Sequence, residues 1–409
     1  MRSLIPVLSL TLSVLTLNAQ DWNQWRGPSR TGVTAAFKSP ATWPDRLKQI
    51  WKVDAGEGHA SPVVSGNRVY LLSRVADREA VTSFDLASGK QLWRESYDAP
   101  YRMNPAATSH GKGPKSTPVV DGGRLFTLGI SGVLSAWDAQ SGRLLWRKDF
   151  KNDYPTTVPD FGTAMSPMVT ANPNLLIVHV GGGKQGAILA LDPQSGNSKW
   201  TWAGDGPAYA SPIVAEFEGV RHVVTQSQSH VLGLSLADGK PLWEIPFTTD
   251  YDQNIVTSVS AGDLLVYGGL SKPLTAVRVK RAAGKWTTEQ VWQNPDVPMY
   301  MSSPIEQGGL LFGLTHRNRG QFFCLDLKTG KTLWTTRGRE GENAALIEAG
   351  GMLLTATTEG ELIVARPSAQ SFEIVKRYTV ADSPVWAHPV PAGALILIKD
   401  ASSLSAWGF

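Results

Sequence analysis

The chain has 409 residues, 42% of them hydrophobic and 18% charged, a balance typical of a folded globular protein. Its formal net charge is only +4 and no run of basic residues accompanies it, which argues against nucleic-acid binding. Cys324 is the single cysteine, so no disulfide forms within the chain. Its apolar neighbours in FFCLDL predict a buried strand residue, with a reactive thiol as the alternative.

The first residues have the pattern of an export signal. Arg2 precedes an apolar run over residues 4–17, and the small-residue cleavage pattern Leu-Asn-Ala ends at Ala19. We therefore expect residues 1–19 to be a signal peptide and the remainder to be periplasmic or extracellular. No later stretch reaches about 18 uninterrupted apolar residues, so no transmembrane segment is expected. Residues 20–49 are expected to form an N-terminal extension.

A turn pattern recurs along the rest of the chain. In AWDAQSGRLLW (136–146), an aspartate caps the turn amides, a glycine takes the left-handed position of a bulged hairpin, and a tryptophan follows on the next strand. Because this strand is outermost in its repeat, the large flat ring is expected to fill the wedge between neighbouring repeats. The predicted docking residues are Trp51, Trp93, Trp146, Trp200, Trp243, Trp292 and Trp334. A degenerate copy ends at Tyr378.

A second sequence motif, used here as a marker, recurs with the turn in each repeat. A Ser/Thr-Pro pair followed by apolar residues predicts a short strand that tolerates proline at its start. Residues 50–409 hold eight copies at an average spacing of 45 residues, the size of one four-stranded propeller blade. The copies begin at Ser61, Thr117, Ser166, Ser211, Thr257, Ser303, Ala344 and His388. The sequence therefore predicts an all-β fold, an eight-bladed β-propeller over residues 50–409.

The two ends of this region complement each other. The last repeat offers three strands, beginning at Pro389 and continuing over 394–400 and 402–409. Residues 50–53 stand alone before the first repeat, as a strand without a sheet. We expect this N-terminal strand to close the last blade, which would leave no open sheet edge.

Several motifs resemble those of a known family. The pattern of 136–146, repeated at 190–200, resembles the tryptophan-docking motif of the pyrroloquinoline-quinone (PQQ)-type β-propellers. The stretch Trp-Arg-Gly-Pro at 25–28 resembles the opening of secreted bacterial PQQ-like repeat proteins, and 113–118 and 386–389 are similar to further stretches of that group. The resemblance implies two functional relatives. Quinoprotein alcohol and sugar dehydrogenases hold PQQ and calcium over the propeller channel, whereas the barrel-assembly propeller lipoprotein is a scaffold without cofactor.

The residues offer little support for catalysis. The vicinal cysteine pair implied by the dehydrogenase resemblance is absent, because Cys324 is alone. Oxygen donors are scattered among the loops that cross between blades, and we interpret them as turn-capping or solvated groups, with a calcium cluster as the alternative. They are Asp160, Asp205, Asp250, Asp252 and Asn254. The seven histidines have no metal-binding spacing. We therefore expect no catalytic residue, metal site or cofactor, and keep PQQ with calcium as the alternative.

The loops that cross between blades are where a binding site would form. The loop 94–116 is the longest and combines basic and aromatic residues, which favours contact with an anionic or aromatic ligand or with a protein partner. The alternatives are that the loop residues simply cover the protein surface, or that the histidines form hydrogen bonds that only stabilise the fold. The candidate contacts are His59, Arg102, Lys112, Lys115, Asn254, Tyr300, Asn343, Trp386 and His388.

The preferred interpretation is a secreted, non-catalytic PQQ-like propeller that binds a protein partner or a small ligand at its channel mouth. A monomer suffices, because the closed ring satisfies its own sheet edges. One alternative is a PQQ-dependent alcohol or sugar dehydrogenase with a divergent site. Another is polysaccharide recognition or cleavage, which rests on exposed aromatic residues alone.

Overall fold

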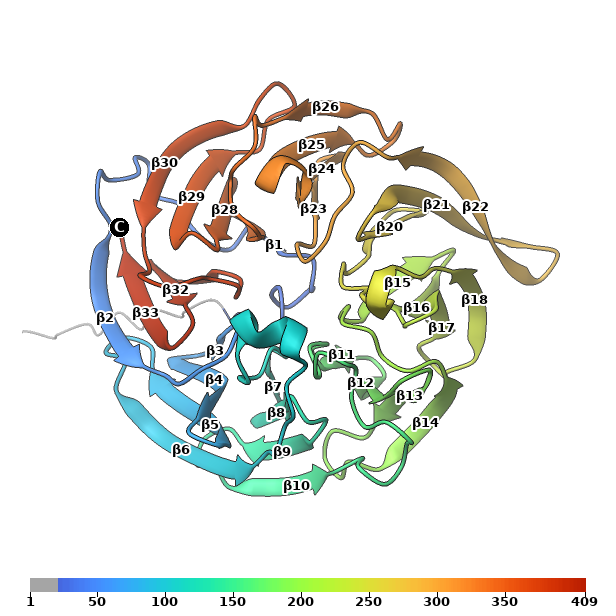
Figure 1. The fold of residues 1–409 in the computed structure, drawn as a ribbon, viewed down its shortest axis with the longest axis horizontal. Coiled ribbons are helices and arrows are strands. Elements are labelled where there is room, and N and C mark those ends of the chain that lie inside the picture. The colour runs from blue at the N-terminus through green and yellow to red at the C-terminus, as the bar shows by residue number, and fades with distance from the viewer. Residues whose placement is uncertain (1–20) are drawn as a thin grey trace, which may run out of the picture.

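The computed structural model describes residues 21–409, so the predicted signal peptide 1–19 lies outside the described residues. Eight sheets are arranged radially around a central channel, each with its strands ordered from the channel to the perimeter (Figure 1). The predicted eight-bladed β-propeller is confirmed. The described residues contain no helix with the length and apolarity needed to cross a membrane.

The blades follow one another in chain order. From the inner to the outer strand, blades 1 to 4 are β3 (Val63–Ser65), β4 (Arg68–Val75), β5 (Arg78–Asp85) and β6 (Gln91–Asp98); β7 (Val119–Asp121), β8 (Arg124–Leu128), β9 (Leu134–Asp138) and β10 (Leu144–Lys148); β11 (Met168–Ala171), β12 (Asn174–Gly182), β13 (Gln185–Leu191) and β14 (Ser198–Gly204); and β15 (Ile213–Phe217), β16 (Val220–Gln226), β17 (His230–Ser235) and β18 (Pro241–Pro246). Three short 3-10 helices lie in loops: η1 (Pro105–His110), η2 (Asp250–Asp252) and η3 (Arg317–Arg319).

The second half repeats this arrangement. Blades 5 to 8 are β19 (Val259–Ala261), β20 (Leu264–Gly269), β21 (Lys272–Ala282) and β22 (Lys285–Asn294); β23 (Ile305–Gln307), β24 (Leu310–Thr315), β25 (Gln321–Asp326) and β26 (Thr332–Thr335); β27 (Ala344–Ala349), β28 (Met352–Thr357), β29 (Glu361–Arg366) and β30 (Glu373–Thr379); and β31 (Val390–Ala392), β32 (Leu395–Lys399), β33 (Ser403–Gly408) and β2 (Lys48–Asp54). The β21–β22 hairpin is longer than its counterparts and projects from the perimeter (Figure 1).

Blade 8 is built from both ends of the described chain. Its outer strand β2 pairs antiparallel with β33, with Trp51 opposite Ala406 and Val53 opposite Leu404. The predicted closing strand is confirmed and begins two residues earlier than expected, at Lys48. Because β2 is held by its hydrogen bonds to β33, the ring is closed by non-covalent pairing alone.

Indole rings join neighbouring blades. Six of the seven predicted docking tryptophans donate their indole N–H to a backbone carbonyl in the turn of the next blade, over 2.8–3.3 Å. Trp243 differs, because blade 5 replaces the short turn with the long β21–β22 hairpin. Its N–H instead donates to His222 Nδ1 within its own blade. Tyr378 donates its hydroxyl to the carbonyl of Pro44 at 2.6 Å.

A belt of hydroxyls circles the channel at the starts of the inner strands. In six successive contacts, the backbone N–H of one blade's marker residue donates to the side-chain hydroxyl of the next blade's marker. The residues run in order His388, Ser61, Thr117, Ser166, Ser211, Thr257 and Ser303. This belt explains why the repeat needs Ser or Thr there, since each hydroxyl satisfies a buried amide of its neighbour. Blade 7 has alanine at this position and interrupts the belt.

The N-terminal extension crosses the other end of the channel. We call residues 21–47 the strap. Its carboxylate at Asp21 accepts from the amide of Gly66, and Ser39 donates to the carbonyl of Gly350, so it contacts turns that follow inner strands. Within it, β1 (Val33–Thr34) adds a parallel fifth strand to blade 7 by pairing with β27. Trp22, Phe37 and Trp43 of the strap are buried in a core shared with blades 1, 7 and 8.

Candidate functional site

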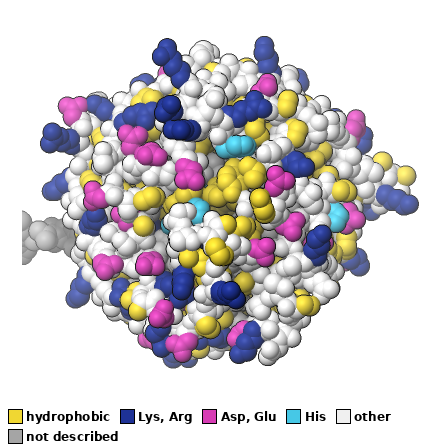
Figure 2. Space-filling view, in the orientation of Figure 1, with side chains coloured by type: hydrophobic (Ala, Val, Ile, Leu, Met, Phe, Trp, Pro, Cys, Tyr) yellow, Lys and Arg dark blue, Asp and Glu magenta, His cyan; other side chains and the backbone are white. Residues whose placement is uncertain are grey.

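The loops that cross between blades surround a cavity of about 530 Å³ at the centre of one face of the ring. We call it the channel-mouth cavity. Residues from η1 and η2, both next to the central opening in Figure 1, contribute to its wall. Figure 2 shows apolar side chains gathered at the centre of this face, with charged residues distributed around them. Its volume is within the range of small-ligand sites in proteins.

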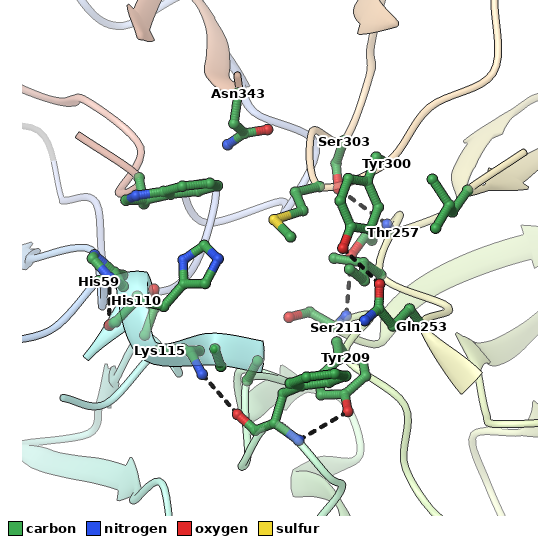
Figure 3. Close-up of a pocket in the computed structure, with 18 of the residues that line it drawn as sticks. His59, His110, Lys115, Tyr209, Ser211, Gln253, Thr257, Tyr300, Ser303 and Asn343 are labelled. Atoms are coloured by element: carbon green, nitrogen blue, oxygen red, sulfur yellow. Dashed lines mark hydrogen bonds between the residues drawn. The ribbon is translucent and has the colours of Figure 1, made fainter. Parts of the chain in front are cut away.

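Six of the nine predicted contact residues line this cavity. Because the crossing loops converge on the channel axis, residues far apart in the sequence, such as His59 and Asn343, meet here (Figure 3). The six are His59, Lys115, Tyr300, Asn343, Trp386 and His388. Trp386 forms an edge-on contact with the ring of His110, with the ring centroids 4.7 Å apart.

The structure places the other three elsewhere. Arg102 lines a separate cavity of about 390 Å³ beside the loop 94–116. Lys112 is exposed and lines neither cavity. Asn254 is fully buried, and its amide Nδ2 donates to the carbonyls of Ser227 and Phe247. Asn254 thus braces the loop that carries η2 and does not face the cavity.

Two guanidinium groups fill the channel below the cavity. Arg30 donates to the carbonyls of Pro212, Pro167 and Ser166, and Arg26 donates to that of Pro304 at 2.6 Å. All four acceptors lie at or beside the hydroxyl belt. Burial lowers the pKa of both side chains to about 9, so both remain charged at neutral pH.

Trp25 contacts both guanidiniums and also lines the cavity. Its ring lies 5.3 Å from the guanidinium carbon of Arg26 and 5.5 Å from that of Arg30, which are cation–π distances. The ring also meets His388 edge-on, at 5.5 Å between centroids. The strap therefore contributes one lining residue and two buried cations to a site otherwise formed by the blades.

Lys115 is a further cation without an acidic partner. Its Nζ donates to the carbonyl of Phe161 at 2.7 Å, which uses one of its three donors. Burial lowers the pKa of Lys115 to about 8, so the ammonium stays mostly protonated at neutral pH. In the part of the chain that the structure describes, no carboxylate forms an ion pair with Lys115, Arg26 or Arg30.

The lining histidines are neutral at physiological pH. Burial lowers the pKa of His59 and of His388 to about 3 in each case. The Nε2–H of His59 donates to the carbonyl of His110 at 2.9 Å, which fixes the tautomer because a carbonyl only accepts. Nε2 of His388 is buried without a hydrogen-bond partner. These rings thus line the cavity without adding charge to it.

Sequence reasoning missed several lining residues. They include Trp25 from the strap, Phe161 and Tyr209 from neighbouring loops, and Tyr251 from η2. The hydroxyl of Tyr209 accepts from the amide of Phe161 at 3.2 Å, and so helps to hold the loop that also binds Lys115. Only Trp25 had a sequence signal, since it belongs to the Trp-Arg-Gly-Pro stretch of the family resemblance.

The lining does not match the chemistry of a PQQ and calcium site. Calcium needs six to eight oxygen ligands with carboxylates among them, yet the cavity lining contains no aspartate or glutamate. No group of three or more metal-ligating side chains is found between residues 21 and 409. Cys324 is buried in β25, away from the cavity, and burial raises the pKa of its thiol to about 12. These residues therefore do not fit the calcium-held quinone.

Comparison with protein families and curated sequences gives consistent matches. The model of a family described as outer membrane protein assembly factor BamB matches residues 45–109 and 77–336. BamB of Shewanella oneidensis is 26% identical over 237 residues, which cover 54% of this chain and 56% of that protein. BamB of Yersinia pestis is 22% identical over 71% of this chain and 72% of its own length. The chain thus spans little more than half of the Shewanella relative.

Solved structures share the fold at low identity. The crystal structure of BamB from Moraxella catarrhalis matches 89% of this chain and 98% of that chain, with a TM-score of 0.62 and 15% identity. A europium-containing methanol dehydrogenase matches 95% of this chain and 98% of that chain, with a TM-score of 0.65 and 12% identity. Both kinds of protein have this propeller architecture, so the fold alone does not choose between them.

Proposed function

Because the chain belongs to the family described as outer membrane protein assembly factor BamB, we propose that it is an exported, non-catalytic propeller that binds a protein partner. The partner would dock on the face that carries the channel-mouth cavity. By analogy with the name of these relatives, the process served would be assembly of outer membrane proteins.

The composition of the cavity is the observation that carries this proposal. Its wall combines aromatic and aliphatic side chains with hydroxyls already engaged in the belt, and it offers no carboxylate or thiol for chemistry. The titratable groups that it does contain include Lys115 and His59, which donate hydrogen bonds to backbone carbonyls. An apolar, aromatic hollow surrounded by charged residues is typical of a binding surface.

A titration separates this proposal from the dehydrogenase alternative. Purified protein would be titrated with PQQ and calcium by calorimetry, and then assayed for dye reduction with primary alcohols, glycerol and glucose. We expect no saturable heat and no dye reduction. Tight PQQ binding accompanied by alcohol or sugar oxidation would replace the proposed function with that of a quinoprotein dehydrogenase.

Site-specific cross-linking tests the docking face. A photo-reactive amino acid at Tyr251, on the cavity rim, is expected to capture a defined envelope protein in the producing cells, identified by mass spectrometry. The matched control places the same group at Lys38, an exposed residue of the strap at the other end of the channel. Equal capture from both positions, or capture from Lys38 alone, would contradict docking at the cavity face.

A further inference from the structure

The channel-mouth cavity has an excess of buried positive charge. Arg26 and Arg30 lie directly below it, bonded only to carbonyls and to Gln24, and Lys115 lies in its wall, bonded only to a carbonyl. Carbonyl dipoles satisfy some of the donors, although Nε of Arg26 is buried without a partner, and they leave the net charge uncompensated. Burying a charge without an opposite charge is costly. A ligand that brings a carboxylate would offset this cost.

Acidic residues near the site do not supply that compensation. Burial is the main cause that raises the pKa of Tyr209 and of Tyr300; Asp160 and Asp252 add to the first shift and Glu342 to the second, so all three carboxylates are close by. None of the three lines the cavity.

Asn343 adds a polar group that faces the cavity. It is only 5% exposed, and its amide extends into the cavity (Figure 3). Its backbone is bonded to Thr358, but its side chain has no hydrogen-bond partner among the described residues. An amide that faces a cavity without a protein partner can both donate to and accept from a ligand, so its orientation favours a polar ligand group.

The rim presents an aromatic anchor. Tyr251 is 79% exposed, the most exposed of the large hydrophobic residues described. Its backbone φ of 59° is in the left-handed region, which is costly for a tyrosine and projects it from η2. Within the hollow, Met301, Leu270 and Trp386 offer apolar surface. Exposed aromatic and methionine side chains are enriched at protein interfaces.

These groups are distributed from the buried wall to the solvent-exposed rim. A ligand that meets Lys115 and Asn343 inside and Tyr251 outside must extend across the mouth of the cavity. An extended peptide does this naturally, because its successive side chains present an acidic group and an apolar group at different depths.

We propose that the channel-mouth cavity binds an acidic segment of the protein partner, with a carboxylate beside Lys115 and an adjacent aromatic or aliphatic side chain in the hollow. The inference rests on the proposed function and specifies the chemistry of the partner. The contact between carboxylate and ammonium is charge-assisted, and Asn343 supplies a neutral hydrogen bond to the peptide. Tyr251 covers the chain where it leaves the cavity.

Peptide selection tests this chemistry. Short random peptides displayed on phage would be selected on the immobilised full chain, and enriched sequences synthesised with blocked termini. We expect enrichment of Asp or Glu next to Phe, Tyr, Trp or Leu. Fluorescence polarisation should then show affinity that falls as ionic strength rises from about 0.05 M to about 0.5 M. Replacing the acidic residue with its amide should abolish most of the binding.

Matched variants locate the site. Lys115→Gln is expected to weaken the peptide about tenfold and to flatten its salt dependence. The control is Lys112→Gln in the same loop, which removes an exposed lysine outside the cavity and should leave binding unchanged. Asn343→Ala and Tyr251→Asn should each weaken binding several-fold. Neither side chain makes a bond that the fold needs, and asparagine suits the left-handed backbone at 251.

The results also separate this inference from the proposed function. Enrichment of basic or uncharged peptides, or equal losses from Lys115→Gln and Lys112→Gln, would overturn the acidic-segment proposal. Cross-linking from Tyr251 could still succeed in that case, leaving the scaffold function standing. Binding of a free aromatic carboxylate such as benzoate, without binding of any peptide, would likewise overturn it.

Discussion

At the scale of single residues, the glycine in the recurring turn explains why the turn pattern is so regular. Gly142 has a φ of 81°, which favours glycine, and a Cβ atom there would lie 2.7 Å from the ring of Trp93 in the preceding blade. A Cβ atom at Gly89, Gly196 or Gly239 would likewise meet the ring of the docking tryptophan in the preceding blade. Each glycine therefore serves both the turn and the space that the indole occupies.

These two roles predict that a methyl group added at the turn glycine lowers stability more where it meets the indole than where the space is open. Gly142→Ala should lower the free energy of unfolding by about 3 kcal/mol, combining left-handed strain with overpacking against Trp93. Gly122→Ala is the matched control, because Gly122 has a φ of 53° but nothing within 4 Å of its Cβ position. It should cost only about 1 kcal/mol. Equal losses in urea unfolding would show that the indole contributes nothing to the requirement.

Buried histidines predict sensitivity to acid. His179 is 3% exposed and donates from Nε2 to the carbonyl of Asp205, and burial lowers its pKa from an ordinary value of 6.5 to about 4. Between these values the unfolded chain binds more protons than the folded chain, so stability falls as pH falls. At pH ~4.5 the wild type should lose about 2 kcal/mol relative to pH 7 through this residue. His179→Gln should remove that part of the pH dependence, as measured by urea unfolding at several pH values.

At the scale of elements, the hydroxyl belt joins inner strands that share no sheet. The contacts are short and regular, for example 3.1 Å from the amide of Ser61 to the hydroxyl of Thr117 and 3.0 Å from the amide of Thr117 to that of Ser166. Each blade thus completes the hydrogen bonding of its neighbour at the channel, while the indoles join the same blades near the perimeter.

The belt predicts a strong effect from an isosteric substitution. Thr117→Val keeps the shape of the side chain but leaves the amide of Ser61 without an acceptor, and should cost about 1–3 kcal/mol of unfolding free energy. Thr117→Ser retains the hydroxyl and is the control, with a smaller expected loss. The belt would lack the assigned role if valine and serine gave the same urea midpoint.

At the scale of the whole molecule, the strap acts as a hub for the ring. Arg30 bonds to blade 3 through Ser166 and Pro167 and to blade 4 through Pro212, while Arg26 reaches blade 6 through Pro304. One segment outside the repeats thereby joins blades that are not neighbours. The same guanidiniums place positive charge beneath the cavity, so ring stability and ligand preference share a physical origin.

The hub predicts a loss that extends beyond one blade. Arg30→Lys cannot reproduce the hydrogen bonds that the guanidinium donates to carbonyls of two blades, and should lower the free energy of unfolding by about 2–4 kcal/mol. Hydrogen exchange should accelerate at the inner strands β11 and β15 together. Arg46→Lys, an exposed position of the strap, is the control and should stay within about 0.5 kcal/mol of the wild type. Faster exchange confined to the strap would contradict the hub.

The sequence alone determined the number of blades, the docking turns and the closing strand. These features are local or periodic: an Asp, a Gly and a Trp lie within nine residues of one another in the 138–146 turn, and the unit repeats until the two ends match. The channel-mouth site was predictable in part, because a residue at the start of an inner strand, such as His388, must face the channel wherever the blade count is right.

Only the tertiary structure decided how the charges are distributed. Arg26 meets the carbonyl of Pro304 across 278 positions, a contact that leaves no local pattern. Asn254 and Arg102 lie in crossing loops like Lys115, yet one is used to brace its loop and the other faces a different cavity. Irregular loops have no period that sets the direction of each side chain, so their packing against the closed ring determines which residues reach the channel.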